Sequence, residues 1–166
     1  MISDAMMTAF FEGQHQELHH VFGAHIVGED TVFTVYAPNA KQVKLIGSFN
    51  HFNGNENMMQ HVHFQGVYQL KVKGNHQGAL YKYEIETYAG TVLHKADPFA
   101  FYAEKPPHTA SKVFELNGFQ WHDQHYFYEK KKPYDQPMFV YEVHAGSWKK
   151  QDGSYLSYRA LARSEE

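Results

Sequence analysis

Residues 66–88, GVYQLKVKGNHQGALYKYEIETY, contain two runs in which apolar and polar side chains alternate. Alternation with a period of two is typical of β-strands with one buried face, because successive side chains of a strand point to opposite sides. Gly74–Gly78 separates the two runs and predicts a turn. The side chains predicted to face the core are Tyr68, Leu70, Val72, Tyr81, Tyr83 and Ile85, and those predicted to face solvent are Gln69, Lys71, Lys82, Glu84 and Glu86.

The same period extends outward from this segment. Further strands are predicted at Thr31–Tyr36, Gln42–Gly47, Val92–Lys95 and Ser111–Leu116. Strands of this length, with turn signals roughly every ten residues, favour an antiparallel β-sandwich, and the lack of crossover helices between them argues against an α/β fold. The aromatic residues predicted to lie in the core are Phe33, Tyr36, Tyr68, Tyr81 and Tyr83.

Composition excludes several classes of function. The 166 residues carry a net charge of −3 and contain no cysteine, so a basic nucleic-acid surface, disulfides and thiolate metal sites are not expected. Lys130–Lys132, the one basic run, is interpreted as part of a solvated linker. No apolar stretch approaches the ~20 residues of a membrane span, and the N-terminus lacks the pattern of a secretory signal, so a cytoplasmic location is expected.

His61 and His63 would share one face of a strand over residues 60–64. Two imidazoles could bind zinc or copper. The spacing offers no third ligand, so they are interpreted as surface histidines, and neither a metal nor another cofactor is predicted.

Several motifs occur in order along the chain. They are Phe11-Glu12-Gly13, Phe22-Gly23-Ala24-His25, Val35-Tyr36-Ala37-Pro38-Asn39-Ala40, Gly47-Ser48-Phe49-Asn50, Leu80-Tyr81-Lys82-Tyr83-Glu84-Ile85, Lys95-Ala96-Asp97-Pro98-Phe99-Ala100 and Tyr141-Glu142-Val143-His144-Ala145-Gly146-Ser147-Trp148. Together these motifs resemble the N-terminal portion of glycogen branching enzymes, which transfer α-1,4-glucan chains to form α-1,6 branches. The last motif is the most specific to that family.

The resemblance implies an all-β fold: an immunoglobulin-like antiparallel β-sandwich of the family-48 carbohydrate-binding type, followed by the first strand of a truncated (β/α)₈ barrel at Met138–Trp148. The expected domains are an N-terminal lead-in at 1–25, the sandwich at 26–118, a linker at 119–137 and the start of the barrel at 138–166. In such barrels the carboxylates of retaining glycosyl transfer lie on later strands. The resemblance therefore implies an enzymatic parent protein, no catalytic residues in this chain, and no activity of the chain alone.

The resemblance also suggests a glucan site. In related modules a tryptophan two residues after the Phe-Asn pair stacks on glucose, and Phe52 takes that place here, beside Asn50. Lys82 matches a glucan-contacting lysine. A second tryptophan usually follows the next hairpin turn, where the candidates here, Val92 and Leu93, are not aromatic. The alternatives are that Phe52 folds back onto the core and that Lys82 is a solvated strand lysine.

Three hypotheses follow from these residues. The first is the N-terminal part of a branching enzyme whose partners are α-glucan (glycogen or amylose) and the missing catalytic barrel; a related debranching hydrolase is its nearest rival as the parent. The second is a free-standing glycan-binding or regulatory module, and the third is a purely structural domain. An unpaired strand at Phe139–His144 would also favour self-association.

Overall fold

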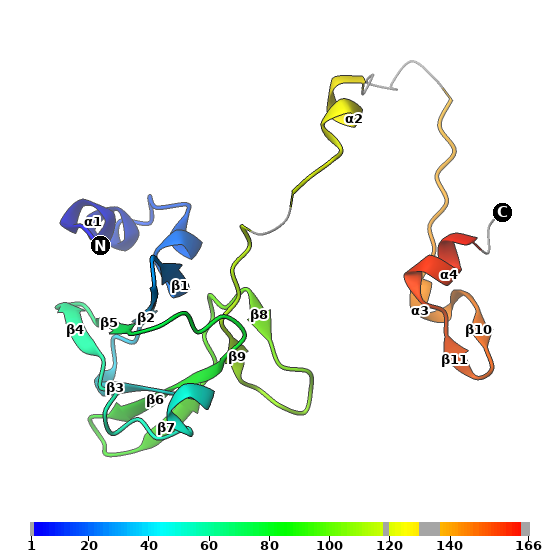
Figure 1. Cartoon of the computed structure of the whole chain (residues 1–166). Helices are drawn as coiled ribbons and strands as arrows, with labels where there is room; N and C mark the ends of the chain where they lie inside the picture. The colour runs from blue at the N-terminus through cyan, green and yellow to red at the C-terminus, as the bar shows by residue number, and fades with distance from the viewer. Residues whose placement is uncertain (1, 118–119, 130–136, 164–166) are drawn as a thin grey trace. The chain divides into compact units, whose positions relative to one another are not determined.

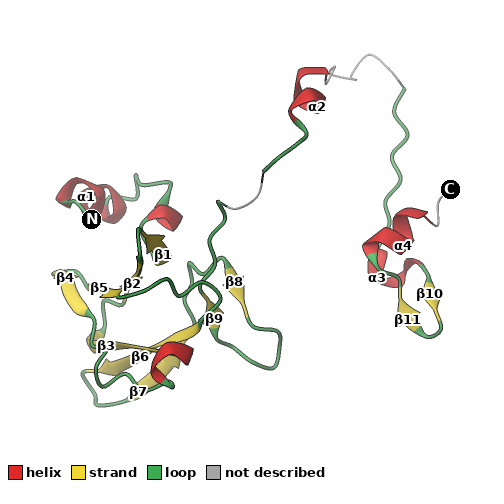
Figure 2. Cartoon of the chain, viewed as in Figure 1, coloured by secondary structure: helices red, strands yellow, loops and turns green. Residues whose placement is uncertain are grey.

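The computed structural model describes residues 2–117, 120–129 and 137–163, and the chain divides into two compact units, residues 1–119 and 120–166 (Figures 1 and 2). The elements of the first unit are α1 (Asp4–Phe11), η1 (Leu18–His20), β1 (Gly23–Val27), β2 (Asp30–Tyr36), β3 (Ala40–Gly47), η2 (Ser48–Asn50), β4 (Gln60–His63), β5 (Val67–Val72), β6 (Leu80–Thr87), β7 (Val92–Lys95), β8 (Tyr102–Ala103) and β9 (Ser111–Lys112). Those of the second unit are α2 (Gln124–Glu129), α3 (Ala145–Trp148), β10 (Lys150–Gln151), β11 (Ser154–Tyr155) and α4 (Tyr158–Arg163).

Two antiparallel sheets make up the first unit. One has four strands in the order β1-β2-β5-β4; the other has five, in the order β3-β6-β9-β8, with β7 also paired to β6. Phe33 lies opposite Leu70 in the first sheet, and Leu45 lies opposite Tyr83 in the second. The two segments of residues 66–88 therefore belong to different sheets, and the turn between them crosses from one layer to the other. The predicted all-β antiparallel sandwich is confirmed.

The core lies between the inner faces of the two sheets, where the alternation in the sequence predicts it. Phe33, Tyr81 and Tyr83 are fully buried, and Tyr68 is 5% exposed. The Tyr81 and Tyr83 hydroxyls both donate to Oδ2 of Asp97, at 2.7 and 2.8 Å. In the described part of the chain, every buried side-chain nitrogen or oxygen has a hydrogen-bond partner.

A second apolar cluster joins α1 to the sandwich. The buried side chains of this cluster are Met7, Val21, Phe22 and Val67. Tyr36 was predicted to lie in the main core, and that prediction is wrong: its side chain is 41% exposed, and its ring packs edge-on against Phe10 of α1 at 5.3 Å. Strand β1 begins at Gly23, so the sandwich starts within the segment predicted as a lead-in.

Two other predicted strands differ from the structure. The strand expected at Ser111–Leu116 is shorter, because β9 covers only Ser111–Lys112. Residues 137–144 have no regular structure, and Ala145–Trp148 form α3, so the predicted strand over Met138–Trp148 is not formed. Among the described residues, 137–144 pair with no strand, and an extended segment cannot form a ladder by itself because its backbone groups need a neighbour.

In the described parts of the chain, no helix is both long and apolar enough to cross a membrane.

Candidate functional site

Of the three predicted site residues, Lys82 lies on the outward face of the five-stranded sheet, and Asn50 and Phe52 lie in the loop that follows β3. Because Tyr81 and Tyr83 of β6 point into the core, Lys82 and Glu84 project to the other side. Ile46 lies opposite Lys82 on the neighbouring strand. We call this surface the outward face, defined by Lys44, Ile46, Lys82, Glu84 and His94.

The loop over residues 48–57 folds against this face. Gly54 approaches so closely that an added Cβ would lie 2.8 Å from Lys44 Cβ and 3.1 Å from Ile46 Cγ2. This cover explains why Ile46 is only 2% exposed on the outer side of its strand. The loop is therefore a second layer at one edge of the outward face.

Asn50 holds the loop together. Its Oδ1 accepts a hydrogen bond from the Gly47 N–H at 2.8 Å, and its Nδ2 donates to the Leu45 carbonyl and to Asn57 Oδ1, both at 2.9 Å. The amide thus makes three internal hydrogen bonds. The geometry gives Asn50 a positioning role, and its direct contact with a ligand stays a prediction.

Phe52 is presented to solvent by a left-handed turn. His51 and Phe52 have φ of 53° and 56°, and the Phe52 side chain is 44% exposed. For residues other than glycine this conformation costs about 1–2 kcal/mol each, and for a bulky residue it is unusual. In the described part of the chain, Phe52 is not among the residues that pack against either hydrophobic core cluster, which argues against the alternative in which the ring folds back onto the core. A strained backbone that holds an apolar ring in water is a feature found at functional sites.

Lys82 and Glu84 provide polar groups beside the loop. Lys82 Nζ donates to Thr109 Oγ1 at 2.8 Å, which holds the ammonium over the sheet. Glu84 lies 3.2 Å from both Lys44 Nζ and His94 Nε2. Partial burial of Glu84 opposes ionisation, but hydrogen bonds from Lys44 and His94 outweigh it and lower the pKa of this carboxyl. Glu84 therefore stays ionised and suits hydrogen-bond acceptance better than proton donation.

His94 was not predicted from the sequence. Val92 and Leu93 were the candidates on β7, but Leu93 lies opposite Ile85 on the inward side, whereas His94 lies opposite Glu84 on the outward face. The His94 side chain is 54% exposed. Extending the alternation of β6 across the hairpin to β7 would have identified it, because paired residues in an antiparallel ladder share a face.

The other histidines of interest pack against aromatic rings. His61 stacks on Tyr68 with ring centroids 4.8 Å apart, and His63 stacks on Phe11 at 5.0 Å. The ladder is irregular between His61 and His63. Among the described residues, no group of three or more histidine, cysteine, aspartate or glutamate side chains could hold a metal ion.

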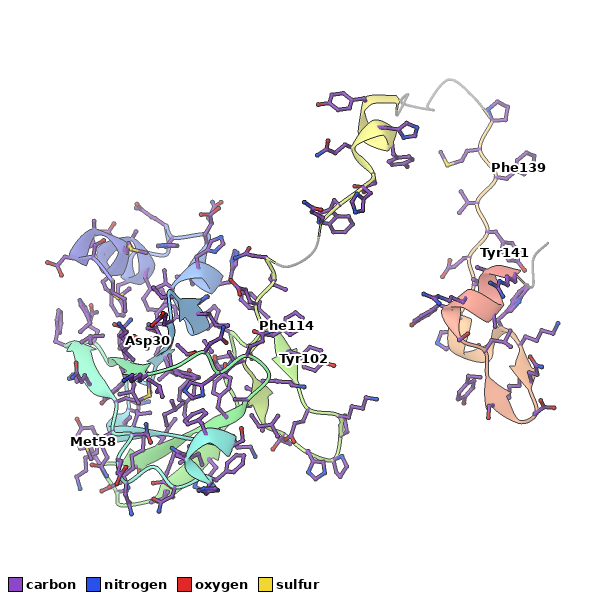
Figure 3. All side chains as sticks on the ribbon, viewed as in Figure 1. Asp30, Met58, Tyr102, Phe114, Phe139 and Tyr141 are labelled. Atoms are coloured by element: carbon purple, nitrogen blue, oxygen red, sulfur yellow. The ribbon has the colours of Figure 1, made fainter. Side chains whose placement is uncertain are left out.

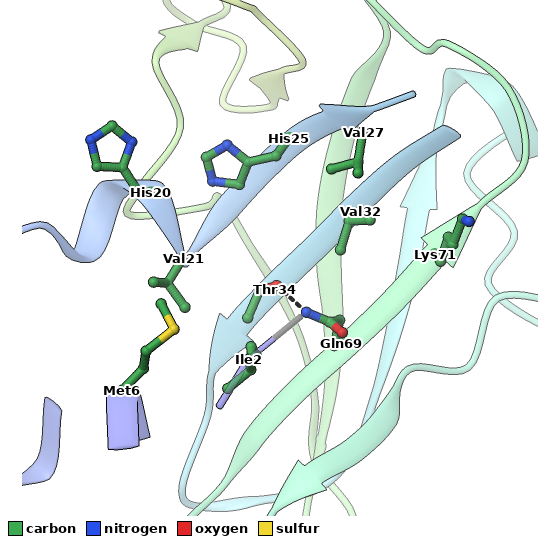
Figure 4. Close-up of a pocket in the computed structure, with 10 residues that line it drawn as sticks. All are labelled: Ile2, Met6, His20, Val21, His25, Val27, Val32, Thr34, Gln69 and Lys71. Atoms are coloured by element: carbon green, nitrogen blue, oxygen red, sulfur yellow. Dashed lines mark hydrogen bonds between the residues drawn. The ribbon is translucent and has the colours of Figure 1, made fainter. Parts of the chain in front are cut away.

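A separate hollow of about 360 Å³ lies on the outer side of the four-stranded sheet, beneath α1 and η1 (Figure 4). Gln69 donates to Thr34 at 3.0 Å on its floor, and Lys71 at its rim forms an ion pair with Asp30 at 2.8 Å. Its apolar lining consists of Ile2, Met6, Val21, Val27 and Val32. These aliphatic walls are better suited to an aliphatic group of a ligand than to the face of a sugar ring.

Comparison with known proteins identifies residues 21–100 as a match to carbohydrate-binding module 48, the isoamylase N-terminal domain. The chain is 46% identical over 167 residues to 1,4-alpha-glucan branching enzyme GlgB of Geobacillus stearothermophilus, with 96% of this chain and 26% of that enzyme covered. It is 43% identical over 159 residues to the GlgB of Bacillus cereus strain B4264, with 92% of this chain and 25% of that enzyme covered. The chain thus spans about a quarter of the length of these relatives.

Solved structures share the fold. An apo pullulanase from Klebsiella pneumoniae matches with a TM-score of 0.50 and 24% identity, covering 58% of this chain and 11% of that chain. The pullulanase complexed with maltotetraose from Anoxybacillus sp. LM18-11 matches with a TM-score of 0.52 and 20% identity, covering 69% of this chain and 16% of that chain. At this identity the similarity concerns the fold of the sandwich alone.

Proposed function

We propose that the outward face binds α-1,4-glucan chains as part of a 1,4-alpha-glucan branching enzyme, because residues 21–100 match carbohydrate-binding module 48. The similarity to two GlgB enzymes over more than nine-tenths of the chain supports the choice of parent. The substrate of the parent would be glycogen or amylose, and the partner of this region would be the catalytic barrel of the same protein.

The observation that carries the glucan-binding part is the geometry of Phe52. Sugar rings have apolar faces that stack on aromatic side chains, and their hydroxyls need a few fixed hydrogen-bonding groups. Phe52 offers an exposed ring on a strained turn of the loop that covers one edge of the outward face, and Lys82, Glu84 and His94 offer polar groups on that face. A residue chosen only for stability at this turn would be glycine, which adopts positive φ without strain.

The face has groups for binding rather than for bond cleavage. Retaining glycosyl transfer needs a nucleophilic carboxylate and a carboxylic acid with a raised pKa close to it. Glu84 is held ionised, and Asp97, whose pKa is raised by burial, lies inside the core, where Oδ2 accepts two tyrosine hydroxyls and Oδ1 accepts the Phe99 N–H. We therefore expect no branching of amylose by this chain alone. We also infer a cytoplasmic location, which the cysteine-free composition permits.

The test is native electrophoresis of the chain in gels with and without glycogen. Wild-type protein should be retarded by glycogen, and Phe52→Ala should migrate as in the glycogen-free gel. Phe64→Ala is the matched control, because Phe64 is also an exposed phenylalanine, at 83%, but lies in the turn between β4 and β5 of the other sheet. Unretarded wild-type protein would contradict glucan binding and leave the sandwich as a structural partner of the barrel.

A further inference from the structure

A second exposed aromatic pair lies at the far edge of the five-stranded sheet. Tyr102 of β8 and Phe114, just after β9, are 47% and 37% exposed, and their rings stack with centroids 5.4 Å apart and planes inclined by 28° (Figure 3). Two large apolar rings that pack on each other and remain in contact with water contribute little to the core. We call the pair the Tyr102–Phe114 platform, and its exposed aromatic surface is of the kind that sugar rings bind.

The strand register places Tyr102 on the outward face. Tyr102 lies opposite Lys112, and Lys112 lies opposite Leu80, two residues before Lys82 on β6. Residues directly opposite one another share a face, as do residues two apart on a strand. The platform and Lys82 therefore lie on the same side of one sheet.

The burial pattern around Lys112 confirms this direction. Ser111 and Val113 are each 1% exposed and point into the core, so the side chains of Lys112 and Phe114 project away from it. Lys112 Nζ lies 5.3 Å from the centre of the Tyr102 ring. An ammonium at that place is both a cation above an aromatic ring and a donor for a hydroxyl group.

A hollow of about 400 Å³ lies beside the platform. It is lined by Gly78, Leu80, Tyr102, Ala103, Glu104, Lys105 and Lys112. One oxygen of Glu104 is used, since Oε2 accepts the Ala110 N–H at 2.9 Å. The hollow thus combines one aromatic wall, two lysine amines and a carboxylate, which are the apolar and polar groups that recognise a carbohydrate.

We propose that the Tyr102–Phe114 platform is a second stacking subsite for α-glucan, and that a bound chain crosses the outward face from Phe52 over β6 and β9 to β8. This inference rests on the proposed function of that face. From β3, which the Phe52 loop follows, to β8 the sheet has three inter-strand spacings of about 4.8 Å, roughly 14 Å in all. A disaccharide reaches one platform only, whereas a longer oligosaccharide reaches both.

A second subsite for the same glucan chain would compensate for the weak binding expected of the Phe52 site alone. A single platform binds weakly, because ordering a flexible glucan cancels much of the stacking gain. Once one glucose unit is held at Phe52, the units that follow are at high effective concentration at Tyr102. Selectivity for chain length then follows from the spacing of the two platforms.

The test measures maltose and maltoheptaose affinity by calorimetry on the whole chain. Wild-type protein should bind maltoheptaose more tightly than maltose. Tyr102→Ala should weaken maltoheptaose binding about tenfold and leave maltose binding within about twofold. Tyr102→Phe keeps the ring and should retain the affinity. Tyr88→Ala, at a tyrosine that is 79% exposed in the β6–β7 turn, is the matched control and should change neither.

A measurement on the unmutated chain tests the proposal even if the variants fail to fold. In an NMR titration with maltoheptaose, the backbone amides of Ala103 and Lys112 should shift together with that of Phe52, whereas maltose should shift mainly Phe52. Failure of wild type to bind either sugar would contradict the proposed function itself. Binding that depends on Phe52, with maltoheptaose affinity unchanged in Tyr102→Ala and no shift at Ala103, would overturn the second subsite alone.

Discussion

Tyr83 and Asp97 are joined by a 2.8 Å hydrogen bond at the centre of the sandwich, and the oxygen that accepts it also accepts the Tyr81 hydroxyl at 2.7 Å. The other oxygen of Asp97 accepts the Phe99 N–H at 2.8 Å, and the Asp97 N–H donates to Ser111 Oγ at 2.8 Å. Asp97, in the segment that leads to β8, is therefore tied to β6 through its carboxylate and to the start of β9 through its backbone N–H. Burial raises the pKa of the Tyr83 hydroxyl well above its usual value, so it remains a donor.

Asp97→Ala should destabilise the sandwich by about 2–4 kcal/mol, because two buried hydroxyls and one N–H lose their acceptor. Urea unfolding at pH 7 would measure the loss. Glu29→Ala, at an exposed acidic residue in the β1–β2 turn, should change the free energy of unfolding by less than about 0.5 kcal/mol. Equal losses in the two variants would contradict the role of Asp97.

The stability difference between wild type and Asp97→Asn should depend on pH. Burial raises the pKa of Asp97 and outweighs the hydrogen bonds from Phe99, Tyr81 and Tyr83 that lower it. The folded state therefore holds the proton more tightly than the unfolded state, so the contribution of Asp97 to the free energy of unfolding grows as the pH falls through the folded pKa toward 3.8. Asparagine does not titrate and lacks this contribution.

Urea unfolding of both proteins between pH 7 and pH 4 measures this difference. Comparing the two proteins cancels the opposite effect of Asp30, whose pKa is lowered by the Lys71 ammonium and the Gly74 N–H and which loses stabilising contacts in acid. The difference should move in favour of wild type as the pH falls. A constant or opposite trend would show that the Asp97 carboxyl is not harder to ionise in the folded state.

Glycine substitutions at the left-handed turn should show that the stability of the fold and the binding of glycogen depend on different residues. His51→Gly and Phe52→Gly should each raise the free energy of unfolding by about 0.5–1 kcal/mol, because glycine relieves the strain of positive φ at a smaller entropic cost. His51→Gly should retain glycogen retardation, whereas Phe52→Gly should lose it. Thermal unfolding and the glycogen gel together provide the comparison, and retention of binding in Phe52→Gly would remove Phe52 from the site.

Asn50→Ala should lower stability and glycogen binding together. Its amide makes three hydrogen bonds that hold the loop carrying Phe52, and their loss should cost about 1–3 kcal/mol. Phe52→Ala should lose binding with little change in stability, since the ring is partly in water. Full binding in Asn50→Ala, together with a normal melting temperature, would argue against the positioning role.

The segment before α3 should make the chain self-associate. Met138, Phe139, Val140 and Tyr141 are consecutive apolar side chains, each at least 60% exposed, and a contiguous exposed patch of this kind promotes association. Light scattering coupled to size exclusion should show mass increasing with protein concentration. The double variant Phe139→Asp, Val140→Lys should remain a monomer. A concentration-independent monomer in the unmutated chain would contradict this expectation.

Local alternation was sufficient to predict the fold class and the direction of most strand residues. Tyr81 and Tyr83 are buried, and Lys82 lies on the opposite face, as the pattern predicts. Tyr36 is three residues after Phe33 and next to Val35, both buried, so a period of two already places its side chain on the other face of β2. There α1, a helix far away in sequence, covers it in part, and the period could not reveal that cover.

The site residues that belong to a motif loop could be predicted from the sequence. Those that join the outward face through strand pairing were not predicted. Phe52 and Asn50 both belong to the motif loop, but the three internal hydrogen bonds of Asn50 are visible only in three dimensions. Tyr102 joins the outward face through its pairing with β9, a register that the sequence does not specify, whereas His94 could have been inferred by extending the alternation of β6 across the hairpin to β7. The unformed strand at Met138–Trp148 shows the same dependence, since a strand needs a partner.

Strand β6 contributes core residues and surface residues in strict alternation, and this restricts how the surface can change. A one-residue insertion or deletion within Leu80–Thr87 would exchange its two sides, moving tyrosines into water and Lys82 into the interior. Substitution at Lys82 or Glu84 leaves that arrangement intact. The ligand preference of the domain can therefore diverge by single-residue replacement and by lengthening the flanking loops, whereas length variation inside the central strand would abolish folding and recognition together.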